Sequence, residues 1–386
     1  MSDKKRNVPA LRFNGFSDAW EQRKLGEVVD VNYGKDYKNL SLGKIPVYGT
    51  GGYMLSVSSS LSKDDAIGIG RKGTIDKPYI LKAPFWTVDT LFYCIPRGNN
   101  DLNFIYGVYQ KVNWRSKDES TGVPSLSKST INTLTVRMPS FKEQQKIGAF
   151  FQHLDNTIAL HQRKLDALKQ MKKGFLQQMF PENGGKSPRV RFADFQEEWG
   201  QRKLEVLAVF SKGRGYTKSD LVEKGSPVIL YGHLYTKYEI IINQVNTFVT
   251  MKDKSVISKG NEVIVPSSGE TAKDISRASV IGIKGFILGG DLNIIKPKRE
   301  INSIFLALTI SNGIQQKEMI KRAQGKSIVH LNNSDLKQVK LFYPSLGEQQ
   351  QIGDFFIQLE RIITLYQNKL DQLNTLKRAY LKNMFI

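Results

Sequence analysis

Residues 139–151 read Pro-Ser-Phe-Lys-Glu-Gln-Gln-Lys-Ile-Gly-Ala-Phe-Phe, and residues 344–356 read Pro-Ser-Leu-Gly-Glu-Gln-Gln-Gln-Ile-Gly-Asp-Phe-Phe. A second pattern, Pro-x-x-Arg-Phe-x-x-Phe-x-x-x-Trp-x-Gln-Arg-Lys-Leu, occurs at residues 9–25 and again at 188–204. The first pair is displaced by 205 residues (344 less 139) and the second by 179 (188 less 9). Between these blocks the two halves differ. The chain is therefore a repeated frame that holds two unlike inserts, and the duplication predicts pseudo-twofold symmetry.

Each Pro-Ser block is predicted to open a long helix. Ser140-x-x-Glu143 and Ser345-x-x-Glu348 have the form of capping boxes. Apolar residues then recur at alternating steps of four and three, which is the spacing of a coiled-coil seam. The first seam is Ile147, Phe151, Leu154, Ile158, His161, Leu165, Leu168, Lys172, Phe175 and Met179. The second is Ile352, Phe356, Leu359, Ile363, Tyr366, Leu370, Leu373, Lys377, Tyr380 and Met384.

The matching seams favour packing of the two helices on each other over a separate role for each helix in its own domain. Each helix has about 40 residues and so a length of about 60 Å. Polar residues stand at equivalent seam positions, Lys172 with Lys377 and His161 with Tyr366. Such positions are expected to fix register and orientation at some cost in stability.

The inserts, about residues 26–138 and 205–343, carry short β-like runs divided by Gly, Pro, Asn and Asp. We expect each insert to form a compact domain of irregular strands and loops, so the fold class is α+β. The predicted division is 1–138 for the first domain, 139–181 for the central helix, 182–343 for a linker and the second domain, and 344–386 for the C-terminal helix.

The composition favours a polyanionic partner. The 386-residue chain has a net charge of +21 and a mean hydropathy of −0.35. Nucleic acid is the leading candidate, although a basic protein with no such ligand stays possible. A membrane partner is not expected, because no apolar run is long enough to span a bilayer. The single cysteine, Cys94, and the absence of a signal-peptide core fit a cytoplasmic protein.

The sequence offers no catalytic or metal-binding constellation. Gly68-x-Gly70-x-x-Gly73 is followed by Pro78 and not by the helix that a dinucleotide site needs. The four histidines are scattered, and no cysteine–histidine cluster has metal spacing. We see no nucleophile elbow and no adenine-methyltransferase signature. The chain is therefore predicted to be non-catalytic and to bind no cofactor or metal.

Glycine-flexed loops with cations, hydroxyls and aromatic rings are the candidate nucleic-acid contacts, because such groups reach phosphates and base edges. In the first insert the candidates are Lys35, Lys38, Tyr48, Thr50, Tyr53, Arg71, Lys72 and Thr74. In the second they are Lys212, Arg214, Tyr216, Lys218, Ser267, Ser268, Thr271, Arg322, Lys326 and Ser327. For each loop the alternative is an ordinary solvated turn.

The frame resembles the specificity subunit of type I restriction–modification enzymes. The resemblance rests on the paired blocks at 139–151 and 344–356, their long helices, and the twin Trp-x-Gln-Arg-Lys-Leu entries ending at Leu25 and Leu204. The turns at 48–53 and 70–74 add to it. The resemblance covers essentially the whole chain.

This resemblance implies two target recognition domains, each reading one half of a split double-stranded DNA target, with an antiparallel coiled coil between them as a spacer ruler. It also implies two modification subunits, which methylate adenine, and restriction subunits that complete the nuclease. S-adenosylmethionine, ATP and Mg²⁺ would then belong to those partners. The competing hypotheses are a stand-alone DNA-binding scaffold without enzyme partners, and an enzyme that acts alone.

Overall fold

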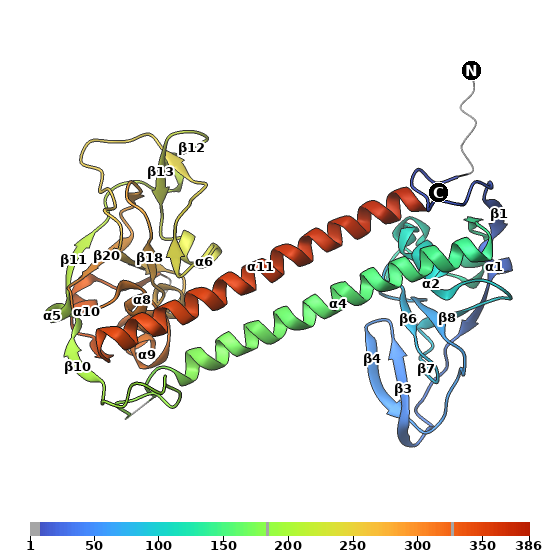
Figure 1. Cartoon of the computed structure of the whole chain (residues 1–386), viewed down its shortest axis with the longest axis horizontal. Coiled ribbons are helices and arrows are strands. Elements are labelled where there is room, and N and C mark those ends of the chain that lie inside the picture. The colour runs from blue at the N-terminus through green and yellow to red at the C-terminus, as the bar shows by residue number, and fades with distance from the viewer. Residues whose placement is uncertain (1–7, 183–184, 326–327) are drawn as a thin grey trace. The chain divides into compact units, whose positions relative to one another are not determined.

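The computed structural model describes residues 8–182, 185–325 and 328–386 (Figure 1). The chain divides into two compact units. Unit 1 comprises Met1–Arg163 and Tyr366–Ile386, and unit 2 comprises Lys164–Leu365. Both boundaries fall inside the long helices, α4 (Phe141–Gln178) and α11 (Leu346–Met384). Each unit therefore contains one insert domain and one end of each helix.

The two predicted helices are confirmed, and their segments pack antiparallel within each unit. In unit 1, the Phe150 ring of α4 lies edge-on to Tyr380 of α11, with 5.0 Å between centroids. In unit 2, Phe175 meets Phe355 in the same way at 5.0 Å. The predicted seam is buried at Ile147, Phe151, Leu154, Leu165, Leu168, Met179, Ile352, Phe356, Leu359, Ile363, Leu370, Leu373 and Met384.

The polar seam positions form contacts that recur in both units. Lys377 pairs with Asp155 at 2.5 Å in unit 1, and Lys172 pairs with Glu360 in unit 2. The lysine side chains are only 16% and 20% exposed, so a shift in register would leave a mostly buried charge without its partner. His161 and Tyr366 place their rings 5.5 Å apart.

The root of each insert is a two-stranded ribbon with the same register in both units. β1 (Glu21–Lys24) pairs antiparallel with β9 (Thr135–Met138). β10 (Gly200–Lys203) pairs in the same way with β22 (Lys340–Tyr343). The tryptophan before each ribbon, Trp20 or Trp199, is buried. The first and last residues of an insert therefore lie side by side.

Each insert contains a sheet with the same arrangement of strands, although the two insert sequences differ. The sequence did not lead us to expect this. In unit 1 the strand order is β2-β8-β5-β6, and in unit 2 it is β11-β20-β16-β18-β14. Neighbours are antiparallel except for β14 beside β18. The strands are β2 (Val29–Tyr33), β5 (Ala66–Gly70), β6 (Tyr79–Leu81), β8 (Leu91–Pro96), β11 (Ala208–Lys212), β14 (Ile241–Ile242), β16 (Val263–Pro266), β18 (Ser279–Ile281) and β20 (Leu292–Pro297).

A smaller sheet accompanies the first in each unit, ordered β4-β3-β7 in unit 1 and β12-β15-β13-β19 in unit 2. Its strands are β3 (Leu42–Gly49), β4 (Gly52–Val57), β7 (Trp86–Thr87), β12 (Leu221–Val222), β13 (Ser226–Ile229), β15 (Phe248–Val249) and β19 (Ile287–Leu288). Short helices complete the domains. They are α1 (Leu25–Val28), α2 (Leu102–Lys111), α3 (Lys128–Thr133), α5 (Leu204–Leu207), α6 (His233–Thr236), α7 (Ala272–Ile275), α8 (Ser303–Ser311), α9 (Gly313–Arg322) and α10 (Asn333–Lys337).

A buried arginine–glutamate pair fixes the start of each long helix. The Nε and Nη2 atoms of Arg12 donate to the two carboxylate oxygens of Glu143 at 2.6 and 2.7 Å. Arg191 donates to Glu348 in the same fork, at 2.7 Å twice. These hydrogen bonds raise the pKa of each guanidinium. Each glutamate carboxylate of the expected capping boxes therefore binds an arginine. The serine half of the second box is formed, because the Ser345 hydroxyl accepts from the Glu348 amide at 3.5 Å.

The next helix residue ties the frame to the insert. Gln144 accepts from the Asp101 amide at 3.0 Å, and Gln349 accepts from the Asn302 amide at 2.9 Å. Asp101 and Asn302 in turn cap α2 and α8. Each amide side chain also donates to the carbonyl of the proline before its long helix. The repeated Glu-Gln pair therefore holds together the segment before the insert, the long helix and the insert itself.

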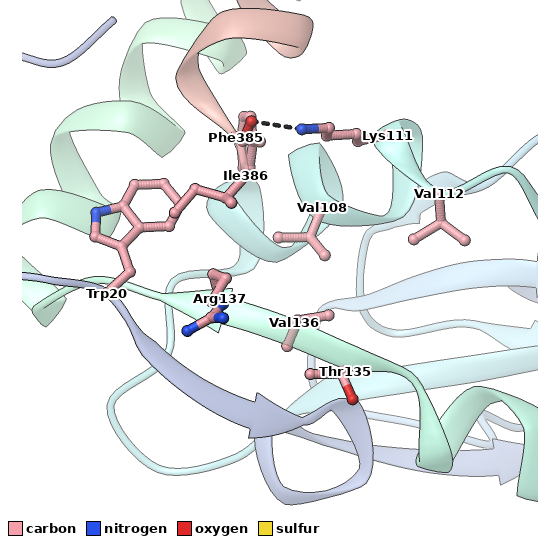
Figure 2. Close-up of a pocket in the computed structure, with 9 residues that line it drawn as sticks. All are labelled: Trp20, Val108, Lys111, Val112, Thr135, Val136, Arg137, Phe385 and Ile386. Atoms are coloured by element: carbon pink, nitrogen blue, oxygen red, sulfur yellow. Dashed lines mark hydrogen bonds between the residues drawn. The ribbon is translucent and has the colours of Figure 1, made fainter. Parts of the chain in front are cut away.

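The residues that directly follow α11 pack into the core of unit 1 (Figure 2). The Phe385 ring stacks on Phe104 at 5.1 Å, and a side chain on Gly107 would come within 2.5 Å of it. The Lys111 ammonium donates to the Phe385 carbonyl beside a cavity of about 210 Å³. Burial lowers the pKa of Lys111. The helix end is thus held by aromatic packing and one hydrogen bond.

Replacing Arg12 by Ala is expected to destabilise unit 1 by about 3–5 kcal/mol, because the buried Glu143 carboxylate loses its partner. Hydrogen exchange measured by mass spectrometry would show faster exchange in unit 1 and unchanged exchange in most of unit 2. Arg189→Ala, which breaks an exposed pair with Glu182, is the control. Equal exchange in both variants would contradict the structural role of the fork.

Candidate nucleic-acid interface

Two loops of each domain meet at one edge of the shared sheet. β2 and β5 both run antiparallel to β8, so they run parallel to each other and end at the same edge. β11 and β16 have the same relation to β20. The loops that follow these strands, 34–38 and 70–74 in unit 1 and 213–218 and 267–271 in unit 2, contain most of the sequence-predicted contacts.

The first loop starts from an equivalent glycine in both units. Gly34 donates to the Leu91 carbonyl at 3.1 Å, and Gly213 donates to Leu292 at 2.9 Å. A Cβ at Gly34 would lie 1.9 Å from the Val88 carbonyl oxygen, and a Cβ at Gly213 would lie 1.8 Å from the Gly289 carbonyl oxygen. Only glycine fits at either position. Each loop therefore begins in close contact with the turn that precedes β8 or β20.

The second loop is held by matching backbone bonds. The Leu126 amide donates to the Arg71 carbonyl at 2.9 Å, and the Leu331 amide donates to Ser267 at 3.0 Å. Arg71 and Ser267 also donate to the turn before β8 or β20, both at 2.8 Å. Arg71-Lys72 and Ser267-Ser268 therefore occupy equivalent places in their own units, although the two loops were predicted separately from the sequence.

Arg71 is positioned at this edge in unit 1. Its guanidinium lies 5.5 Å from the centre of the Tyr33 ring and donates to the Asp89 carbonyl at 3.2 Å. Lys35 and Lys72 are exposed beside it. Lys38 is also exposed but lies 3.9 Å from Asp36 of its own loop. The first domain thus presents a cationic edge.

The hairpin between β3 and β4 is the third loop of unit 1. The Tyr48 and Tyr53 rings lie 6.4 Å apart, and Tyr53 is 63% exposed while Tyr48 packs against Tyr79. The Thr50 hydroxyl lies 3.9 Å from where a Cβ on Gly73 would be, so the hairpin tip adjoins the 70–74 loop. Tyr53 is available to stack on a base, whereas Tyr48 supports the hairpin. Thr74 is half-buried.

Tyr216 has a structural position in unit 2. Its ring is buried, its hydroxyl lies 2.5 Å from the Ser255 hydroxyl, and it accepts from the Lys252 amide at 2.7 Å. The ring therefore has no open face for a base. Lys212, Arg214 and Lys218 around it are exposed.

The Ser267–Thr271 loop is also partly structural. Ser267 is buried, Ser268 is half-buried, and Thr271 caps α7 by accepting from the Asp274 amide at 3.1 Å. Ser268 of β17 (Ser268–Gly269) pairs with His330 of β21 (Val329–His330), which brings the segment after Arg322 beside this loop. Arg322 is half-buried at the end of α9. Lys326 and Ser327 lie outside the described residues.

The third loop of unit 2 was not predicted from the sequence. Tyr231 and Tyr235, just after β13, place their rings 5.7 Å apart. Burial raises the pKa of Tyr235, with smaller contributions from Tyr231 and from the charges of Asp274 and Glu270. The third loop of unit 2 thus carries an aromatic pair, as the hairpin of unit 1 does. Pro-Val followed by Tyr-Gly occurs before both third loops, at 46–49 and 227–232, and was the available signal.

The two edges differ in charge. Unit 1 offers Arg71-Lys72 at the place where unit 2 has the buried Ser267, and the accessible groups of unit 2 are the half-buried Ser268 and the exposed Glu270. Arginine donates to guanine, whereas serine and glutamate accept from amino groups of cytosine or adenine. The same scaffold thus presents different hydrogen-bonding groups in the two domains.

Other kinds of site have little support in the described part of the chain. There, no three His, Cys, Asp or Glu side chains gather as they would to hold a metal ion. Burial raises the pKa of the Cys94 thiol to about 12, so this thiol stays protonated. Across residues 8–182, 185–325 and 328–386, no helix combines the length and the apolar character needed to cross a membrane.

Comparison with known proteins gives a consistent result. The family model for the type I restriction modification DNA specificity domain matches residues 17–170 and 196–375. The type I restriction enzyme MjaVIII specificity subunit of Methanocaldococcus jannaschii is 21% identical over 155 residues, which are 40% of this chain and 35% of that protein. The matched stretch thus spans about a third of that relative's length.

Solved structures share the fold. The S subunit of a type I restriction–modification system from M. genitalium superposes with a TM-score of 0.70 at 14% identity, covering 98% of this chain and 99% of that one. A chain from a study of complex assembly and conformational transition of the type I system gives 0.51 at 15% identity, over 94% and 96%.

Replacing Arg71 by Ala is expected to weaken binding to a duplex that carries the first domain's target by about 1–3 kcal/mol, the contribution of a bidentate guanine contact. Arg71→Lys is the matched control, since it keeps the charge but loses the fork. Titration of labelled duplexes, one per base substitution, would measure both. Unchanged affinity and base preference in the Ala variant would remove Arg71 from the interface.

Proposed function

The chain belongs to the type I restriction modification DNA specificity family, and from this premise we propose that it is the specificity subunit of such a system. Each insert domain reads one half of an asymmetric, split DNA target. The observation that carries this proposal is the repeated sheet edge, where equivalent loops present Arg71-Lys72 in one unit and Ser268 with the exposed Glu270 in the other. Equivalent scaffolds suit two half-sites, and unlike side chains make the half-sites differ.

The helix pair sets the spacer between the half-sites. α4 and α11 are uninterrupted over 38 and 39 residues, and their lysine–carboxylate pairs recur at Lys377 and Lys172. A helix pair held in one register has a fixed length, so the spacer should follow helix length and not insert sequence. The formal charge of +21 supplies affinity for phosphates that does not depend on sequence.

Two modification subunits bind the repeated frame, and restriction subunits complete the assembly. Exposed apolar side chains at equivalent helix positions support this, since Leu160 and Leu365 are 60% and 59% exposed, and Met171 and Leu376 are each 43% exposed. Adenine methylation takes place on the modification subunits, which extrude the base. S-adenosylmethionine, ATP and Mg²⁺ act there, the present chain contributes no catalytic step, and the assembly works in the cytoplasm.

Single-molecule methylome sequencing tests this function. A methylation-free host would express the chain with its cognate modification subunit. A split, asymmetric adenine motif is the expected result. A soluble complex that leaves no new methylation would contradict the proposal and favour a DNA-binding scaffold without active partners.

Deleting residues 158–164 together with 363–369 is expected to shorten the spacer by about 3 base pairs. The deletion removes one heptad from each helix, about 10 Å, and keeps the seam and the four paired charges. The methylome of the variant gives the new spacer. Deleting either heptad alone is the control, because it breaks the register and should abolish modification. An unchanged spacer in the double deletion would refute the ruler.

Replacing Leu160 and Leu365 by Lys is expected to weaken modification-subunit binding at least about tenfold, because two apolar contacts would be lost. Light scattering and titration with the purified subunit would measure stoichiometry and affinity. Leu42→Lys, on β3 and 87% exposed, is the control. Wild-type assembly by the double variant would exclude these leucines from the interface.

A further inference from the structure

A recess lies between the first insert domain and the end of α11 in unit 1. It has a volume of about 510 Å³, and Lys77, Lys377 and Arg378 contribute three cations to its lining. Among the described residues, Asp76 is the one acid in this lining, and its carboxylate is held by Arg115 at 2.5 Å. Lys77 is exposed and, among the described residues, forms no ion pair.

Unit 2 has a recess at the equivalent place. It has a volume of about 280 Å³ and its lining includes Lys172, Lys273 and Arg277 but no acid from the described part of the chain. Lys172 corresponds to Lys377 in the repeated helix, 205 residues apart. The loop cation corresponds too, because Lys77 and Arg277 each stand two residues before the fourth strand in the sheet order, β6 or β18. A cation therefore recurs at this loop position where the inserts otherwise differ.

The unit 1 recess continues toward the candidate DNA edge. A second recess of about 400 Å³ shares Asp76 and Lys77 with it and is lined at its other side by Gly73 and Thr74. One depression thus leads from the 70–74 loop to the helix. In unit 2, α7 connects the 267–271 loop to Arg277 over a few residues and contributes Lys273 to the recess.

Local carboxylates neutralise the deeper cations and leave the outer ones available. Lys377 and Lys172 are engaged with Asp155 and Glu360 on the partner helix segments. Lys77 and Lys273 are exposed. Each recess therefore has a helix lysine in an ion pair at its base and an exposed lysine at its rim. This arrangement suits a singly charged, solvated oxyanion.

We propose that each recess receives a phosphate group of the DNA backbone just outside the bases read by the neighbouring loop, on the side toward the helix pair. This inference rests on the proposed function. The contact carries no base information, so it fixes the position of the duplex on the domain without changing the recognised sequence. Lys77 and Lys273 are the principal contacts, whereas Arg277 is half-buried and lies 3.7 Å from Asp274.

The test is a salt titration of DNA binding by the full chain and by its complex with modification subunits. The DNA probes are a duplex with the methylome-defined target and a scrambled duplex. In Lys77→Ala combined with Lys273→Ala, the slope of log K against log salt should fall by about 2 on both duplexes, about 1 for each lost phosphate contact. The methylated motif should stay that of the wild type. Lys44→Ala and Lys224→Ala, exposed cations outside both recesses, are the controls.

The outcomes separate this inference from the proposed function. A wild-type chain with no preference for its target would undermine the proposed function itself. A wild-type slope in the double variant, with specificity intact, would overturn the phosphate sites alone. Loss of modification-subunit binding at an unchanged slope would also overturn them and assign the recesses to an acidic protein surface. Thermal unfolding at the wild-type temperature would establish that the variant is folded.

Discussion

The buried fork between an arginine and a glutamate is the constraint on which each half of the molecule depends. Arg12 comes from the segment before the first insert, here called the strap, and Glu143 comes from the helix after the insert. The neighbouring Gln144 binds the cap of α2, so three segments distant in sequence share one polar cluster. A carboxylate that is 1% exposed cannot stay charged at low cost without that guanidinium. The strap is therefore part of the core, although it has little regular structure.

Prediction from sequence succeeded where a period or a repeat was present. The alternating steps of four and three between apolar residues predicted both long helices, and the Pro-Ser pairs predicted where they begin. It failed at the capping boxes, because sequence spacing cannot show that Arg191 competes for the Glu348 carboxylate. The common sheet of the inserts was also missed. Backbone hydrogen bonds hold that sheet, and many side-chain sets satisfy them, so the two sequences diverged while Gly34 and Gly213 stayed fixed by steric need.

The candidate interface was predicted in outline but not in the role of each residue. The loops around Arg71 and Ser267 were found as separate glycine-rich turns, and only the strand order shows that they occupy equivalent places. Tyr216 was chosen as an aromatic ring near cations, yet its hydroxyl holds Ser255 and its ring is buried. Tyr231 and Tyr235 were not among the residues predicted from the sequence. Exposure depends on tertiary packing, which short motifs do not encode.

The ribbons at the roots of the inserts have a further consequence. β1 with β9, and β10 with β22, bring the two ends of an insert together in the same register. A domain that enters and leaves its support through one such ribbon can be exchanged as a unit. In genetic terms, crossovers within the two repeated root segments would transplant an entire insert domain and leave the arginine–glutamate pair in place, because Arg12 and Glu143 both lie outside the insert. Under the proposed function, new pairs of half-sites would then arise by recombination, faster than single substitutions could remodel either edge.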